Sequence, residues 1–240
     1  MKTAATVFFR NLWFGALIGS VCWASPGPIG VALMEQLDLL PVLKDGVRCE
    51  QFSSRSRQGG NEKDDSGTTL YQSGSEYVLF ESSRPGCIYR FWITYVFYSP
   101  WVLRFYFDGE TTPRIHMPLS EFFSGTVPPF VSPLVRSFWS SAGGYVSYVP
   151  IPFRKSLKVT ISPYSEDQLF WFNITYHTYD NDDGVVTWTG NENLQNVIAM
   201  WNNVGRDPKP TASNLTRSNT LNLPSGQTTT LENLTGPGEI

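Results

Sequence analysis

Asp108 and Glu110 flank a single glycine, so their two carboxylates can lie close together in a folded chain. Retaining cleavage of a glycosidic bond needs two carboxyl groups about 5–5.5 Å apart, one ionised as nucleophile and one protonated as acid. Asp-Gly is also a favoured tight-turn dipeptide, because both residues accept positive φ. We interpret the pair as a hairpin turn, and Glu121 as a weaker catalytic candidate in a later loop.

Other site chemistries find little support. The two histidines, His116 and His177, lie near no nucleophile-elbow motif, so a Ser-His-Asp arrangement is not expected. The run of residues 57–61 lacks the strand and helix that frame a phosphate loop. The acidic residues Asp180, Asp182 and Asp183 indicate a solvated turn rather than a calcium site. No Cys/His cluster has the spacing of metal ligands, so neither a metal nor a cofactor is predicted.

Composition favours a globular domain with a neutral partner. The net charge is −3 without a basic block, which argues against binding to nucleic acid or to an anionic membrane. Aromatic residues make up 15% of the chain, a share that fits an aromatic β core or exposed stacking platforms for sugars. No later run reaches the roughly 18 to 20 apolar residues of a membrane-spanning helix.

The first 24 residues read as a secretory signal peptide. Lys2 and Arg10 supply positive charge, Phe14–Val21 is a short apolar run, and cleavage is predicted after Ala24. The protein is therefore expected to be secreted. An uncleaved anchor is the alternative for this segment.

Export bears on the cysteines and on three glycosylation triplets. In an oxidising compartment the remaining Cys49 and Cys87 can form a disulfide, although two free buried thiols are nearly as compatible with the sequence. Asn173, Asn214 and Asn233 each begin an Asn-X-Thr triplet, the acceptor for N-glycosylation.

The hydrophobic pattern predicts an all-β sandwich with one or two short helices. A helix is predicted over Val31–Leu40 and a polar loop over Ser53–Thr69. Short β-branched and aromatic runs then alternate with turn residues, as in a jelly roll. The predicted strands are Tyr77–Glu81, Cys87–Tyr95, Trp101–Asp108, Arg114–Met117, Tyr145–Val149, Ser156–Ser162 and Leu169–Tyr179.

Alternation is clearest in Trp101–Asp108. Trp101, Leu103, Phe105 and Phe107 share one face, which we predict to be core, and the polar residues Arg104, Tyr106 and Asp108 share the other. The breaker-rich stretch Pro118–Gly144 is predicted to be one large loop.

The C-terminal part contains a helix and then a composition typical of a linker. Asn191–Asn203 carries apolar residues at helical spacing, with Gly205 as its stop. We predict a first domain over residues 25–205 and a linker over 206–230. Residues 231–240 repeat the Leu, Pro, Gly and Ile of Leu79–Ile88 at the same spacing. This echo predicts the start of a second, truncated copy of the domain, with chance similarity as the alternative.

Four segments, in this order, resemble glycoside hydrolase family 172, also known as domain of unknown function 2961. They are the segments Ser53–Asn61, Pro85–Thr94, Leu103–Glu110 and Gly144–Phe153. The resemblance implies two successive jelly rolls, homo-oligomers built from trimers, and retaining hydrolysis or transglycosylation of α-D-fructofuranosides or α-D-arabinofuranosides. The implied partner is therefore a furanoside-containing glycan.

The family's two catalytic glutamates belong to motifs of its second half, and neither motif is present here. No catalytic residue is therefore assigned, and the chain is expected to be an incomplete enzyme. What carries over is a sugar-contacting loop, matched here by Arg57, Gly59, Gly60 and Asn61, with an acidic residue from Asp64 or Asp65. Arg57, Asn61 and Asp64 are the predicted substrate-binding residues. Ser56 replaces an expected Asp, which weakens hydrogen bonding to sugar hydroxyls at that point.

Two alternatives to an incomplete glycosidase remain open. One is a non-catalytic carbohydrate-binding or oligomer-forming module that presents Trp92, Trp139 or Trp171 to a glycan. The other is a structural fragment that exposes apolar surface because its partner half is missing.

Overall fold

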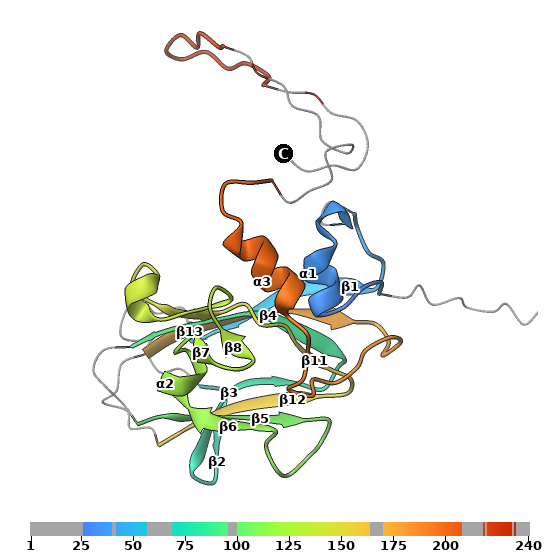
Figure 1. Ribbon diagram of the computed structural model, residues 1–240, viewed down its shortest axis with the longest axis vertical. Coiled ribbons are helices and arrows are strands. Elements are labelled where there is room, and N and C mark those ends of the chain that lie inside the picture. Colours follow the sequence, from blue (N-terminus) through green and yellow to red (C-terminus); the bar gives the residue numbers. More distant parts are fainter. Residues whose placement is uncertain are drawn as a thin grey trace, which may run out of the picture.

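The chain folds as a two-sheet β-sandwich, seen in a computed structural model (Figure 1). The structure describes residues 26–39, 42–56, 69–95, 100–163, 170–207, 218, 220–231 and 233. The predicted signal peptide and the predicted sugar-contacting loop therefore lie outside the described residues. The all-β sandwich predicted from the sequence is confirmed.

One sheet, which we call the β4 sheet, has six strands. Their order is β1 (Val47–Ser53), β13 (Phe170–Tyr179), β4 (Gly86–Tyr95), β10 (Tyr145–Ser147) and β9 (Val135–Arg136), and β11 (Ile151–Phe153) also pairs with β4. The second, the β12 sheet, has the order β2 (Tyr71–Ser73), β3 (Glu76–Ser82), β12 (Leu157–Ser162), β5 (Val102–Phe107) and β6 (Ile115–Pro118). Strands far apart in sequence pair in both sheets, as in a jelly roll.

The core lies between the two sheets and is dominated by aromatic rings. Alternation puts Leu103, Phe105 and Phe107 of β5 inside, each fully buried, as predicted. The rings of Phe80 in β3 and Tyr176 in β13 meet edge to face at 4.8 Å, so the contact joins the two sheets. Gly86 in β4 allows the Phe153 ring to pack closely against the strand. A Cβ at this position would lie only 2.6 Å from that ring.

The stretch Pro118–Gly144 is not the open loop that the sequence suggested. It contains α2 (Leu119–Phe122), β7 (Thr126–Val127), β8 (Phe130–Val131) and the 3₁₀ turn η3 (Phe138–Ser140), besides β9. Phe122, Phe123 and Phe130 are buried, and the ring of Phe122 lies 4.2 Å from that of Phe130. Proline and glycine limit each element to a few residues, while the burial of these rings draws the segment onto the core.

The N-terminal and C-terminal helices lie on the outer side of the β4 sheet (Figure 1). The predicted helix at Val31–Leu40 is observed as α1 (Val31–Glu35) followed by the 3₁₀ turn η1 (Leu37–Leu39). The predicted C-terminal helix is α3 (Gln195–Asn202), and α1 and α3 contact each other. None of the helices in the described part of the chain is long and apolar enough to cross a membrane.

The C-terminal residues 220–231 are exposed and form no helix or strand. The domain boundaries predicted from composition, including a linker over 206–230 and a second domain from residue 231, stay predictions.

Candidate functional site

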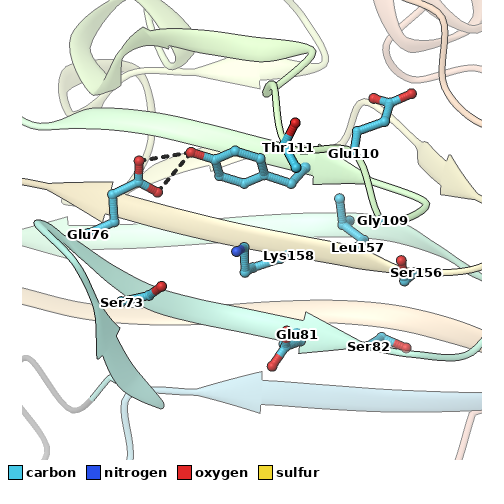
Figure 2. A pocket seen from close by; sticks show the side chains of 11 residues that line it. Ser73, Glu76, Glu81, Ser82, Gly109, Glu110, Thr111, Ser156, Leu157 and Lys158 are labelled. Atoms are coloured by element: carbon cyan, nitrogen blue, oxygen red, sulfur yellow. Dashed lines mark hydrogen bonds between the residues drawn. The ribbon is translucent and has the colours of Figure 1, made fainter.

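An open groove of about 450 Å³ crosses the outer face of the β12 sheet (Figure 2). Its volume lies in the range of small-ligand sites. The lining is mostly polar and comes from β2, β3, β5, β12 and the turn after β5: Ser73, Glu76, Glu81, Ser82, Tyr106, Gly109, Glu110, Thr111, Ser156, Leu157 and Lys158. The groove is therefore a candidate ligand-binding site.

Strand alternation explains why polar side chains gather there. Glu81, Lys158 and Tyr106 are direct cross-strand neighbours on β3, β12 and β5. The residues next to them in sequence, such as Phe80, Val159 and Phe105, are fully buried in the core. Successive side chains of a strand point to opposite faces, so the three polar residues point outward.

Glu76 is the most constrained carboxylate of the groove. Its oxygens accept hydrogen bonds from the Tyr106 hydroxyl at 2.8 and 3.0 Å, which are the dashed lines in Figure 2, and from the Thr160 hydroxyl at 2.6 Å. Arg104 pairs with it at 3.4 Å and also donates to Ser162 at 2.6 Å. Glu76 thus joins three strands, and its acceptor capacity serves the fold.

Tyr106 and Lys158 complete the middle of the groove. Desolvation and the adjacent Glu76 carboxylate raise the pKa of Tyr106 to about 12, so its hydroxyl stays protonated and donates to Glu76. The Lys158 ammonium lies 4.8 Å from the centroid of the Tyr106 ring, a cation–π contact. No ion pair to Lys158 is found among the described side chains.

The carboxylates at the rim are paired as well. Glu81 accepts a hydrogen bond from the Tyr71 hydroxyl at 2.9 Å. Glu110 accepts from Arg114 Nε at 3.0 and 2.8 Å and from its Nη2 at 2.5 Å, and these hydrogen bonds lower the pKa of Glu110. The groove can exchange hydrogen bonds with a hydroxylated ligand, but its carboxylates already accept hydrogen bonds from neighbouring side chains.

Asp108 holds a turn together. Both Asp108 and Gly109 have positive φ, as predicted for a tight turn. One carboxylate oxygen accepts from the backbone N–H groups of Lys155 at 2.7 Å and Ser156 at 3.1 Å, and the other accepts from the Thr187 hydroxyl. The structural interpretation of Asp108 and Glu110 therefore agrees with their geometry.

The pKa of Asp108 makes part of the stability depend on pH. Desolvation acts to raise this pKa, but the hydrogen bonds from Thr187, Lys155 and Ser156 outweigh it and lower it. A depressed folded-state pKa stabilises the fold above the unfolded-state value of about 3.9, and that contribution is lost as the pH falls through the folded-state pKa.

We expect Asp108→Asn to lower the free energy of unfolding by about 1–2 kcal/mol at pH 7, because charge-assisted hydrogen bonds are weakened. The difference from wild type should shrink as the pH falls below about 3.9, because the carboxyl of the unfolded wild-type chain then takes up a proton, and it should vanish below the lower folded-state pKa. Urea unfolding at pH 7 and pH 3 measures both values. Asp183→Asn is the matched control, since Asp183 is exposed, and should change neither. An equal loss at both pH values would contradict this assignment.

The predicted substrate-binding residues Arg57, Asn61 and Asp64 all lie outside the described residues. The described chain just before them is fixed to the β4 sheet. The Ser54 N–H donates to the Phe172 carbonyl at 3.1 Å, and the Phe172 N–H donates to Ser54 Oγ at 3.2 Å. The start of the segment is thus anchored beside β13, not beside the groove.

Cys49 and Cys87 are free in the structure, which does not contain the predicted disulfide. Cys49 on β1 and Cys87 on β4 both pair with His177 on β13 between them. Two strand spacings amount to about 10 Å, beyond the ~7 Å that a disulfide can bridge between Cα atoms. Cys49 is exposed and Cys87 is buried, and burial raises the pKa of the Cys87 thiol.

The remaining predicted positions are scattered over the fold. Asn173 lies on β13, half-buried, and accepts a hydrogen bond from Arg90. Asn233 is exposed, and Asn214 lies outside the described residues. Asp180 pairs with Arg84 and Asp182 with Arg154, so this acidic run forms ion pairs at a turn. No group of acidic, His and Cys side chains suited to a metal is found in the described ranges.

Sequence reasoning missed Glu76 and Lys158 as groove residues, and Thr160 as a partner of Glu76. The signal was present for Lys158 and Thr160, because the apolar residues Leu157, Val159 and Ile161 alternate with them and fill the core. Glu76 was missed because it precedes the first clear residue of its strand.

The comparison with family models decides where this sandwich belongs. Residues 45–196 match the model described as the GH172 first beta-sandwich domain. The chain belongs to glycoside hydrolase family 172. The match covers more than half of the sequence and spans the strands from β1 to β13, so the resemblance seen in the sequence is confirmed. A search of curated proteins finds no match.

Proposed function

We propose that this chain provides the first sandwich of a secreted family 172 protein that hydrolyses or transglycosylates α-D-fructofuranosides or α-D-arabinofuranosides. The observation that carries the proposal is the family match over residues 45–196, nearly the whole described sandwich. Export and assembly into homo-oligomers belong to the proposal, the former because of the signal-like N-terminus and the latter because of the family resemblance.

Within this function the sandwich supports and binds the glycan and does not break the bond. In support, the carboxylates that could be considered as catalytic groups already form hydrogen bonds that hold the fold together. Asp108 holds the backbone of Lys155 and Ser156, Glu110 is held by Arg114, and Glu76 joins three strands. A retaining enzyme needs an ionised nucleophile and a protonated acid on either side of one glycosidic bond. These three side chains instead form hydrogen bonds to other parts of the fold.

A non-catalytic carbohydrate-binding module is the second candidate function. The observation that favours it is the exposure of aromatic side chains outside the core. Trp139 in η3 is 91% exposed, whereas Trp101 in the core is 1% exposed. Both candidates require that the chain bind a glycan.

Calorimetric titration of the full chain with an α-D-arabinofuranosyl oligosaccharide tests the proposed function. We expect saturable binding to this ligand and no heat of binding with a cello-oligosaccharide of the same length, because the site is expected to fit furanose rings. Absence of binding to the furanoside, or equal binding to both ligands, would contradict the proposal.

A further inference from the structure

The outer face of the β4 sheet carries two tryptophans among polar residues. Phe91 and Ile93 of β4 and Phe170 and Phe172 of β13 are buried in the core, so the residues between and beside them point outward. We call this surface the tryptophan face and define it by Gln51 of β1, Arg90, Trp92 and Thr94 of β4, and Trp171, Asn173 and Thr175 of β13.

The strand register puts the two indoles within reach of one ligand. Trp92 pairs with Asn173 and Thr94 pairs with Trp171, so the tryptophans are diagonal neighbours on adjacent strands. Diagonal positions lie about 7–8 Å apart, a separation that long side chains span. Thr175 pairs with Arg90 on one side and with Gln51 on the other. The polar groups therefore surround the indoles.

Another part of the same sheet face is covered by the chain itself, and its composition differs. There Cys87 and Tyr179 are buried together with Val185 and pack against Ile29 and Tyr89. The Gly30 N–H donates to the Tyr89 hydroxyl at 2.8 Å, which fixes the covering segment. Where protein covers this sheet, the face is apolar and closed. The tryptophan face begins at Arg90, the residue that follows Tyr89 in β4.

The indoles are positioned but not paired. Both are half-buried, and neither has a ring contact or a hydrogen bond with any residue that the structure describes. Gly144, just before β10, leaves room for the Trp92 ring, since a Cβ there would overlap the indole nitrogen. Trp101 and Trp188, by contrast, contact other aromatic rings in the core.

The polar residues of the face suit a neutral, hydroxylated ligand. Arg90, the face's charged residue, donates to the Asn173 side chain, and Thr94 donates to the Gly143 carbonyl at 2.9 Å. Val146 of β10, which pairs with Trp92, is only 6% exposed, so the two indoles are the accessible apolar side chains of the face. Indole rings together with amide and hydroxyl groups match the C–H faces and hydroxyls of sugars.

We infer that the tryptophan face binds furanose rings of the glycan, with Trp92 and Trp171 as stacking platforms and Asn173, Thr175 and Gln51 as partners of the hydroxyls. This inference rests on the proposed function for the identity of the sugar. It locates the binding on the β4 sheet rather than in the groove.

The test titrates Trp92→Leu and Trp171→Leu full-length variants with the α-D-arabinofuranosyl oligosaccharide. Leucine keeps apolar bulk but removes the ring, so we expect each variant to bind about tenfold more weakly, the factor that corresponds to an aromatic contact of about 1.4 kcal/mol. Glu81→Gln in the groove is the control and should bind like wild type. Trp variants that bind like wild type, or a Glu81→Gln variant that loses binding instead, would overturn the inference.

A measurement on the unaltered protein guards against variants that fail to fold. Hydroxyl-radical footprinting with mass spectrometry should show that the oligosaccharide protects Trp92 and Trp171 from oxidation but leaves Trp139 reactive. Protection of Trp139 alone, or of none of the three despite calorimetric binding, would place the sugar elsewhere. Absence of calorimetric binding by wild type would instead reject the proposed function, and with it this site.

Discussion

Trp101→Ala is expected to lower the free energy of unfolding by about 3–5 kcal/mol, the usual cost of truncating a buried Trp. Trp101 is 1% exposed, and its ring meets those of Tyr95 in β4 and Phe170 in β13 at 5.1 and 5.2 Å. It precedes β5 of the opposite sheet, so the ring joins the two layers. Alanine would leave a cavity between the sheets that the strands cannot close without breaking their pairing.

Trp139→Ala is the matched control, because it removes the same side chain from a position that is 91% exposed. We expect a change within about 0.5 kcal/mol, as for other surface substitutions. Chemical denaturation of the two variants and wild type at one pH measures both differences. Similar losses in the two variants would contradict the sandwich arrangement, as would a Trp101→Ala variant that unfolds like wild type.

The core of the sandwich could be predicted where strands alternate strictly. The face of Trp101, Leu103, Phe105 and Phe107 follows from the period of two, and the structure buries all four residues. β1 could not be found in this way. It lies at the edge of its sheet and has no strict alternation of buried and exposed residues, so Val47–Ser53 shows no strand pattern. Its pairing with β13 is a tertiary effect.

Two features depend on contacts between residues that are far apart in the sequence. The Pro118–Gly144 segment was expected to be an irregular loop because of its proline and glycine content, yet Phe122, Phe123 and Phe130 bury it against the core. For Cys49 and Cys87 the sequence left both a disulfide and two free thiols open, and the strand order that puts β13 between them could not be foreseen. Strand order follows from long-range packing, which a one-dimensional pattern does not contain.

The candidate sites were only partly predictable. The turn interpretation of Asp108 and Glu110 followed from backbone preferences and agrees with the contacts of both side chains. The sequence also singled out Trp92, Trp139 and Trp171 as exposed aromatics. It could not show that Trp92 and Trp171 share one face through the pairing of β4 with β13, whereas Trp139 lies apart in η3.

The central claim is that residues 45–196 bind and support the glycan without supplying the catalytic nucleophile. Retaining enzymes form a covalent bond between the sugar and a carboxylate during turnover. An epoxide inhibitor with the α-D-arabinofuranosyl configuration captures that carboxylate as a stable ester. Mass spectrometry of the digested protein then identifies the residue. A control sample is unfolded before the inhibitor is added, so that any label it carries is non-specific.

The decisive measurement is therefore the labelling pattern of the full, folded chain after treatment with this inhibitor. We predict no label above the unfolded control on any peptide from residues 45–196. A stoichiometric ester in that range, on Asp108, Glu110 or Glu76 above all, would contradict the account, because it would put the nucleophile in the first sandwich.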